Sequence, residues 1–218
     1  LFYGGLVRKK NVVNTMMTSI FIIGIGIVMW VLFGYSLSFA PSGNAFIGDF
    51  RWLGLEGVSL TEGYTDGASI PNMVFSAFQM MFAVITPALI TGAVAGRMKF
   101  KSIFVFTIFW SLIVYYPLAH MVWGQGGLLG ADGIGALDFA GGDGVHISSG
   151  VSALVLCILL GKRHDYEHSI YRIHNIPTVV LGASLLMFGW FGFNAGSALA
   201  ADGLAAHAFM TTGVSAAA

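Results

Sequence analysis

The charged residues of this 218-residue chain stand in short clusters that are separated by long uncharged stretches. No charge occurs between Lys10 and Asp49, and four similar gaps follow along the chain. A helix needs about 20 mainly apolar residues to cross the hydrocarbon core of a bilayer. Because backbone in lipid must satisfy its own hydrogen bonds, each gap predicts a helix and not a strand. The predicted crossings are 14–39, 72–96, 102–122, 145–161 and 176–198, the fourth of them short.

Both ends of the chain carry apolar residues that fall short of a full crossing. We expect partial spans at 1–7 and 204–218, because neither stretch is long enough to cross an untilted bilayer. The chain starts without an initiating Met, and no basic segment precedes an apolar stretch there as it does in a signal peptide. These features predict part of a longer transporter, with five complete and two partial membrane helices.

The composition indicates an all-α polytopic membrane protein. Hydrophobic residues make up 56% of the chain and charged residues only 9%, with a mean hydropathy of +0.82, whereas soluble domains carry roughly 25% charged residues. Ten basic and ten acidic residues balance, so the net charge indicates no nucleic-acid partner. Cys157 is the only cysteine, which argues against a disulfide framework or a cysteine metal site. We expect no cofactor, no bound metal and no enzymatic activity.

Basic and acidic clusters alternate along the chain, and this alternation predicts the orientation in the membrane. Three loops hold the basic residues Arg8, Lys9, Lys10, Arg97, Lys99, Lys101, Lys162, Arg163 and Arg172. The intervening loops hold the acidic residues Asp49, Glu56, Glu62, Asp66, Asp132, Asp138, Asp143 and Asp202, with Arg51 as their only basic residue. By the positive-inside rule the basic loops are cytoplasmic and the acidic loops external. The predicted location is the cell membrane.

The stretch LDFAGGDGVHISSG, residues 137–150, holds the first candidate functional residues. His146 stands at the start of an uncharged run that ends at Leu160, and an imidazole at membrane depth usually has a partner or a task. Asp138 precedes it in a position where a carboxylate can accept backbone N–H groups and brace the start of a helix. Two interpretations of His146 stay open: a hydrogen bond to a neighbouring helix, or a direct role in function.

Aromatic residues gather near the predicted outer ends of three other helices. Phe78 and Phe82 are four residues apart, as are Phe193 and Ser197, so each pair shares one helix face. Trp123 stands where the chain leaves the membrane. The ordinary interpretations are core packing for the phenylalanines and an interfacial position for the tryptophan. Taken together, they form a candidate site of rings and one hydroxyl group, with a histidine one layer deeper and no carboxylate.

Rings and a hydroxyl group suit a small cation, but their interaction energies are too small to compensate for the loss of its hydration water. Each ring contact contributes roughly 0.5–2 kcal/mol, whereas full dehydration of an ion costs on the order of 20 kcal/mol in the idealised limit. A cation that can lose its charge by giving up a proton avoids this cost. Ammonium can do so, and sodium and potassium cannot. A histidine below the rings then has a task as acceptor, donor or relay of that proton.

Five segments in order along the chain resemble the ammonium transporter family, the Amt/MEP/Rh group: LFYGGLVRKKN, AFQMMFAVIT, AHMVWGQGGLL, ALDFAGGDGVHIS and WFGFNAGS. The resemblance implies an eleven-helix fold with two inverted halves and a homotrimer with one pore per subunit. It implies an outer ammonium site of Trp123, Phe82 and Ser197. It also implies a gate that comprises Phe78, Phe82 and Phe193.

By the same resemblance, Asp138 orders the outer site and His146 is the first of two pore histidines. The second pore histidine belongs to a helix that this chain does not contain, and the loop between Trp123 and Asp138 looks longer than in well-known bacterial members. The family also implies a PII-type regulatory protein as a possible partner at the cytoplasmic face. The implied function is ammonium transport. Two alternatives stay open: an ammonium sensor with little flux, and an unrelated channel whose aromatic residues only pack.

Overall fold

The computed structural model describes residues 1–131, 133–163, 166–168, 170 and 172–218. Within these residues the architecture is helical, and the only strand-like pairing is an isolated bridge between Gly63 and Pro71. Five helical segments are long and apolar enough to cross a membrane: Lys9–Phe39, Asn72–Val94, Phe100–Trp123, Gly142–Leu160 and Ile176–Gly196. The predicted all-α membrane fold is therefore confirmed.

Three of these five segments are composite, because a π-helical turn forms part of each. The helical elements in chain order are α1 (Phe2–Leu6), η1 (Lys9–Asn11), α2 (Val12–Met29), η2 (Trp30–Gly34), α3 (Tyr35–Phe39), η3 (Leu53–Leu55), α4 (Asn72–Val94), α5 (Phe100–Trp110), η4 (Ser111–Tyr115), α6 (Tyr116–Trp123), η5 (Gly142–Ile147), α7 (Ser148–Leu160), α8 (Ile176–Gly196) and α9 (Gly203–Ala217). The fourth span begins at Gly142 and not at residue 145, because the π turn η5 extends it toward the preceding loop.

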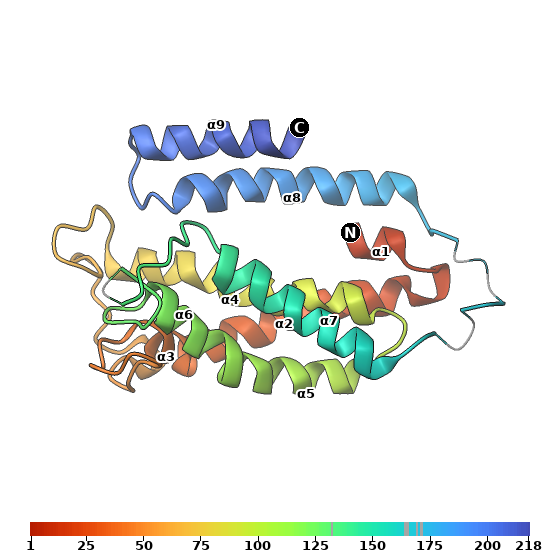
Figure 1. The fold of residues 1–218 in the computed structure, drawn as a ribbon, viewed down its shortest axis with the longest axis horizontal. Coiled ribbons are helices and arrows are strands. Elements are labelled where there is room, and N and C mark those ends of the chain that lie inside the picture. Colours follow the sequence, from red (N-terminus) through yellow and green to blue (C-terminus); the bar gives the residue numbers. More distant parts are fainter. Residues whose placement is uncertain (132, 164–165, 169, 171) are drawn as a thin grey trace.

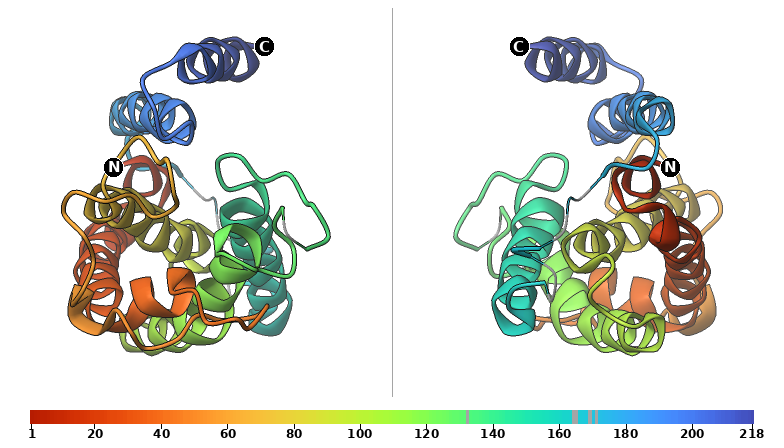
Figure 2. Two further views of the ribbon diagram at one scale, coloured as in Figure 1. Left: turned by 90° about the vertical axis from the view of Figure 1, so that its left-hand side faces the viewer. Right: turned by 90° about the vertical axis from the view of Figure 1, so that its right-hand side faces the viewer.

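Helix α4 occupies the middle of the bundle and packs against α2 on one side and α7 on the other (Figure 1). Helices α8 and α9 lie along one side of this bundle, with α1 next to α8 (Figures 1 and 2). The contact between α1 and α8 is close enough to involve backbone. A Cβ atom added at Gly5 would lie 2.8 Å from the backbone nitrogen of Val179 and 2.9 Å from the carbonyl oxygen of Asn175. Only glycine allows this approach.

A buried aromatic core holds α3, α4 and α6 together near one end of the bundle. Its fully buried rings are Trp30, Tyr35, Phe39, Tyr115 and Tyr116. The indole N–H of Trp30 donates to the carbonyl oxygen of Ser76 in α4 at 3.1 Å. The ring of Tyr116 lies directly on Gly34, where an added Cβ would come within 2.7 Å of it. This core fixes the relative positions of α4 and α6, which carry Phe82 and Trp123.

The two ends of the bundle carry opposite charge. The basic loops that follow α1, α4 and α7 lie at one end, and the loops after α3, α6 and α8 lie at the other (Figure 1). Asp132, which the sequence assigns to an acidic loop, lies outside the described residues. The separation of charge is the arrangement on which the predicted orientation depends.

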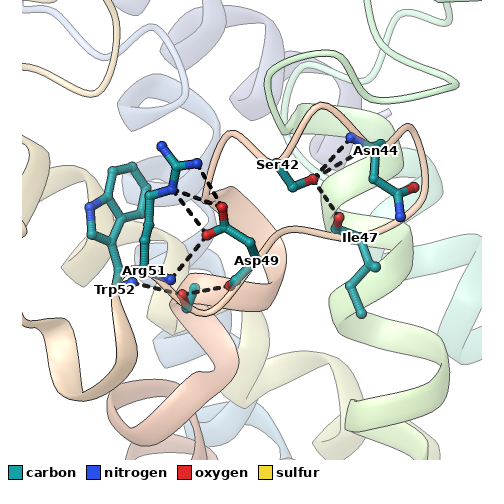
Figure 3. A network of polar contacts seen from close by, with 7 residues as sticks. Ser42, Asn44, Ile47, Asp49, Arg51 and Trp52 are labelled. Atoms are coloured by element: carbon teal, nitrogen blue, oxygen red, sulfur yellow. Dashed lines mark hydrogen bonds and ion pairs between the residues drawn. The ribbon is translucent and has the colours of Figure 1, made fainter.

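Arg51, the one basic residue of the acidic loops, is paired within its own loop (Figure 3). Its guanidinium group donates to both carboxylate oxygens of Asp49, with a shortest N–O distance of 2.6 Å. This hydrogen bonding lowers the pKa of the Asp49 carboxyl group below its usual value. The hydroxyl of Ser36 donates to the Asp49 carbonyl oxygen at 2.7 Å and accepts from the backbone N–H of Trp52 at 2.9 Å. The loop therefore folds back onto α3, and its single positive charge is neutralised locally.

The contact between α2 and α4 gives a direct test of this packing. A Cβ atom at Gly26 would lie 2.9 Å from Cγ2 of Val84 and 3.4 Å from its Cα, whereas a Cβ at Gly24 would meet nothing within 4 Å. We expect Gly26→Ala to destabilise the protein by about 1–3 kcal/mol through overpacking. Gly24→Ala should change stability by less than about 0.5 kcal/mol. Thermal unfolding of the natural full-length protein in detergent compares the two, and equal midpoints would contradict the packing described here.

Candidate functional site

Asp138 caps the start of the fourth span with its carboxylate. One oxygen, Oδ1, accepts the backbone N–H groups of Gly141 at 2.6 Å and Gly142 at 2.8 Å. The other, Oδ2, accepts those of Asp143 at 2.8 Å and Gly144 at 3.0 Å. The first N–H groups of a helix lack partners within the helix, and their combined dipole favours a negative charge there. The predicted bracing of this helix start by Asp138 is confirmed, and its role in an ammonium site stays a prediction.

The cap leads into the π turn η5, which carries His146. Gly141 has a φ of +104°, a left-handed conformation that glycine adopts without strain. The backbone N–H of His146 donates to the Gly141 carbonyl oxygen, five residues earlier, at 3.0 Å. Such π turns occur frequently at functional sites. The turn therefore sets where along the bundle the imidazole is presented.

Trp123 is fixed by the same loop that contains the cap. Its indole N–H donates to the backbone carbonyl oxygen of Asp138 at 2.9 Å. Its ring lies on Gly144, where an added Cβ would come within 2.6 Å of the ring atom Cη2. Asp138 thus uses its side chain to hold η5 and its backbone to hold the tryptophan at the end of α6. Two elements that are far apart in the sequence meet at this one residue.

Four aromatic rings from α4, α6 and α8 form one contact group, the aromatic cluster of Phe78, Phe82, Trp123 and Phe193. Phe82 is at its centre: its ring centroid lies 4.5 Å from that of Phe193, 5.1 Å from that of Phe78 and 5.6 Å from that of Trp123. Only 4% of Phe82 is exposed. The rings are tilted or edge-on to each other, the geometries that aromatic pairs prefer. The structure therefore brings the four predicted aromatic residues together.

Ser197 stands where α8 ends, one turn beyond Phe193. Its hydroxyl donates to the Phe193 carbonyl oxygen at 2.9 Å. A serine hydroxyl has one proton, so this contact leaves its oxygen available only as an acceptor. An acceptor at this position suits a ligand that donates N–H bonds, such as ammonium.

A cavity of about 210 Å³ lies between α4, η5 and α8. Its lining residues are Phe82, Ile85, Leu89, Ala140, Val145, His146, Leu186, Gly189, Trp190, Phe193 and Asn194. The wall is mainly apolar, and the aromatic pair of Phe82 and Phe193 forms part of it. The side chain of His146 is exposed, and its ring makes no hydrogen bond within the described part of the chain. The predicted bridge from this imidazole to a neighbouring helix is therefore not seen among the described residues.

The sequence interpretation did not single out several residues of this cavity wall, including Ile85, Leu186, Trp190 and Asn194. The sequence does contain a signal that could have placed three α8 residues in one wall. Leu186, Trp190 and Phe193 are spaced by four and three residues and so share one helix face. Asn194 is a polar residue inside an apolar run, which is itself unusual at membrane depth.

A family model, the Ammonium Transporter Family, matches residues 1–218, which is the whole chain. The chain belongs to the ammonium transporter family. It is similar to the ammonium transporter of Bacillus subtilis, with 53% identity over 219 residues that cover 100% of this chain and 52% of the relative. The family is the one that the sequence segments indicated.

Solved structures of the ammonium transporter family share the fold. Mep2 of Saccharomyces cerevisiae has a TM-score of 0.82 at 37% identity, and the match covers 99% of this chain and 49% of that one. A sensor Amt protein has a TM-score of 0.84 at 28% identity, and the match covers 99% of this chain and 54% of that one. This chain therefore spans about half the length of the relatives it matches.

The Asp138 cap gives a prediction for how strongly the backbone N–H groups of residues 141–144 are protected from hydrogen exchange. In Asp138→Asn one oxygen is replaced by an N–H₂ group, so two of the four backbone donors lose their acceptor and the negative charge is gone. We expect a loss of stability of about 1.5–3 kcal/mol and faster hydrogen exchange at residues 141–144. Asp143→Asn is the matched control, because the Asp143 carboxylate has no hydrogen-bond partner among the described residues. Unchanged exchange in Asp138→Asn would contradict the cap.

Proposed function

We propose that the natural full-length protein carries ammonium across the cell membrane by recruiting it at the aromatic cluster and passing ammonia through the cavity below. The observation that carries this proposal is the close contact between the tilted rings of Phe82 and Phe193, which both line the same cavity as His146. A cation that reaches the rings from the charged external side meets π faces and one acceptor oxygen. Beyond the ring pair it meets an apolar wall.

The proposed step at the gate is loss of a proton. A few ring contacts at roughly 0.5–2 kcal/mol each do not offset an ion dehydration cost that is on the order of 20 kcal/mol in the idealised limit. Neutral ammonia avoids most of this cost. We propose that ammonium binds between Trp123, Phe82 and Ser197 and gives up its proton near Phe82 and Phe193, either to water on the outer side of the rings or to the imidazole of His146. Ammonia then passes His146, which accepts, donates or relays a proton in the pore.

The charge pattern supports an orientation for this path. The basic loops after α1, α4 and α7 lie at the end opposite to the loop after α6, which contains Asp138 and follows Trp123 directly along the chain (Figure 1). With the basic end in the cytoplasm, the cluster faces outward and the cavity leads inward. The chain would supply one wall of the pore, since it spans about half the length of its relatives. The other wall, including the second pore histidine that the family resemblance implies, would come from the rest of the protein.

A second candidate function is an ammonium sensor that binds the ion at the same cluster with little or no flux. Its support is the similarity of this chain to a solved sensor Amt protein at 28% identity. A sensor needs the outer site but has no need of the cavity below the rings. Substitutions in the cavity therefore distinguish the two functions.

Uptake of methylammonium by proteoliposomes that contain the natural full-length protein tests the proposal. We expect saturable uptake, and we expect Phe193→Ala and His146→Ala to change its rate or its selectivity by at least about tenfold, which corresponds to 1.4 kcal/mol in the barrier. Binding without uptake would favour the sensor. Uptake that neither substitution alters would remove both residues from the mechanism.

The close contact between the Trp123 ring and Gly144 gives a prediction for the outer site. An alanine Cβ at Gly144 would collide with the indole ring, whereas a Cβ at Gly142, in the same π turn, would meet nothing within 4 Å. We expect Gly144→Ala to displace the ring and to raise the KM for uptake about threefold to tenfold, the loss of one cation–π contact. Gly142→Ala should leave the KM unchanged. A KM that rises equally in both variants would contradict a recruiting role of Trp123.

A further inference from the structure

Asn194 is a polar side chain in the otherwise mainly apolar wall below the aromatic rings. It follows Phe193 directly in α8 and lines the same cavity as His146. Apart from these two residues and the indole of Trp190, the side chains of the cavity wall are apolar. A polar residue at membrane depth is costly unless it has a partner or a task. The hydrogen bonds around Asn194 indicate which of its atoms has the partner.

The amide nitrogen of Asn194 is engaged by a neighbouring helix. Its Nδ2 lies 2.9 Å from Oγ1 of Thr212 in α9. Thr212 is buried, and its hydroxyl donates to the carbonyl oxygen of Ala208 at 2.7 Å. A threonine hydroxyl has a single proton. Because that proton points to Ala208, Oγ1 can only accept from the asparagine, and the asparagine must be the donor.

This order of donors fixes the orientation of the amide group. With Nδ2 held by Thr212, the remaining polar atom is the carbonyl oxygen Oδ1, and no described residue donates a hydrogen bond to it. Asn194 is only half-buried, since it borders the cavity. A neutral acceptor that has no partner among the described residues therefore stands beside the space that the substrate would cross.

We propose that Asn194 is a specificity-determining residue, whose Oδ1 accepts an N–H bond from the substrate just inside the Phe82–Phe193 pair. Thr212 is the positioning residue that keeps the amide in this orientation. The inference rests on the proposed function and deepens it. Ammonia that enters an apolar cavity has lost its water, and a single acceptor replaces part of that lost hydrogen bonding. An amide oxygen is neutral, so it does not retain a cation as a carboxylate would.

Four substitutions in the natural full-length protein test this assignment by ammonium and methylammonium uptake in proteoliposomes. Asn194→Leu keeps the branched shape and the number of side-chain heavy atoms and removes the acceptor. Thr212→Val keeps the shape of the side chain and removes Oγ1, while Thr212→Ser keeps Oγ1 and removes the methyl group. Thr211→Val is the control, because Thr211 is an exposed neighbour in α9 whose hydroxyl, within the described part of the chain, donates to the backbone carbonyl oxygens of His207 and Ala208 in its own helix.

We expect Asn194→Leu to lower kcat/KM for ammonium about tenfold, as for the loss of one neutral hydrogen bond. Methylammonium has one N–H fewer to offer, so we expect a smaller loss for it, of about threefold. Thr212→Val should lower ammonium uptake by about threefold to tenfold because the amide is no longer oriented. Thr212→Ser and Thr211→Val should match the unsubstituted protein.

The pair of substitutions at Thr212 separates orientation from packing. If Thr212 only filled space, Thr212→Ser would be the damaging change and Thr212→Val would be neutral, and this result would overturn the proposal. Normal uptake in Asn194→Leu would overturn it as well, and if that variant failed to fold, the Thr212 pair would still decide. Absence of uptake in the unsubstituted protein would instead refute the proposed transport function, and the inference that rests on it.

Discussion

The hydrogen bonds of Asp138 are the interactions on which the geometry of the rest of the outer site depends. Its two oxygens take four backbone N–H groups at the start of the fourth span, and its backbone carbonyl holds the indole of Trp123. The helix that presents His146 and the helix that ends in Trp123 are therefore positioned by one residue. The Trp123 ring in turn contacts Phe82, which contacts Phe193. Through this chain of contacts a single residue links four helical segments: the fourth span, α6, α4 and α8.

The balance between hydration and ring contacts explains why such a site would carry ammonium and not a metal cation. The aromatic cluster attracts positive charge but offers no carboxylate to replace lost water, and the cavity below is mainly apolar. A permanently charged ion has no favourable route into that cavity. Ammonia is neutral and still makes hydrogen bonds, so under the proposed function Asn194 and the ring of His146 would replace part of the hydrogen bonding that it loses with its water. Under the proposed function, the same wall would reject ions and admit ammonia.

The sequence predicted the helices well because membrane helices are defined by a local property, the absence of charge over about 20 residues. It also predicted the capping role of Asp138, since that contact spans only a few residues of chain. It did not predict the π turn that starts the fourth span at Gly142, because a shift from four-residue to five-residue hydrogen bonds leaves the hydrophobic pattern unchanged. The proposed role of Asn194 could not be read from the sequence, because the hydroxyl that orients its amide belongs to Thr212, in a different helix.

The central claim is that the substrate crosses because it can lose its proton at the rings. Rubidium is close to ammonium in size and charge but has no proton to release. Flux of both ions into proteoliposomes that contain the natural full-length protein is therefore the most direct measurement. The account predicts that ammonium enters and that rubidium does not, even where rubidium competes at the outer site. Rubidium flux at a rate comparable to that of ammonium would contradict it.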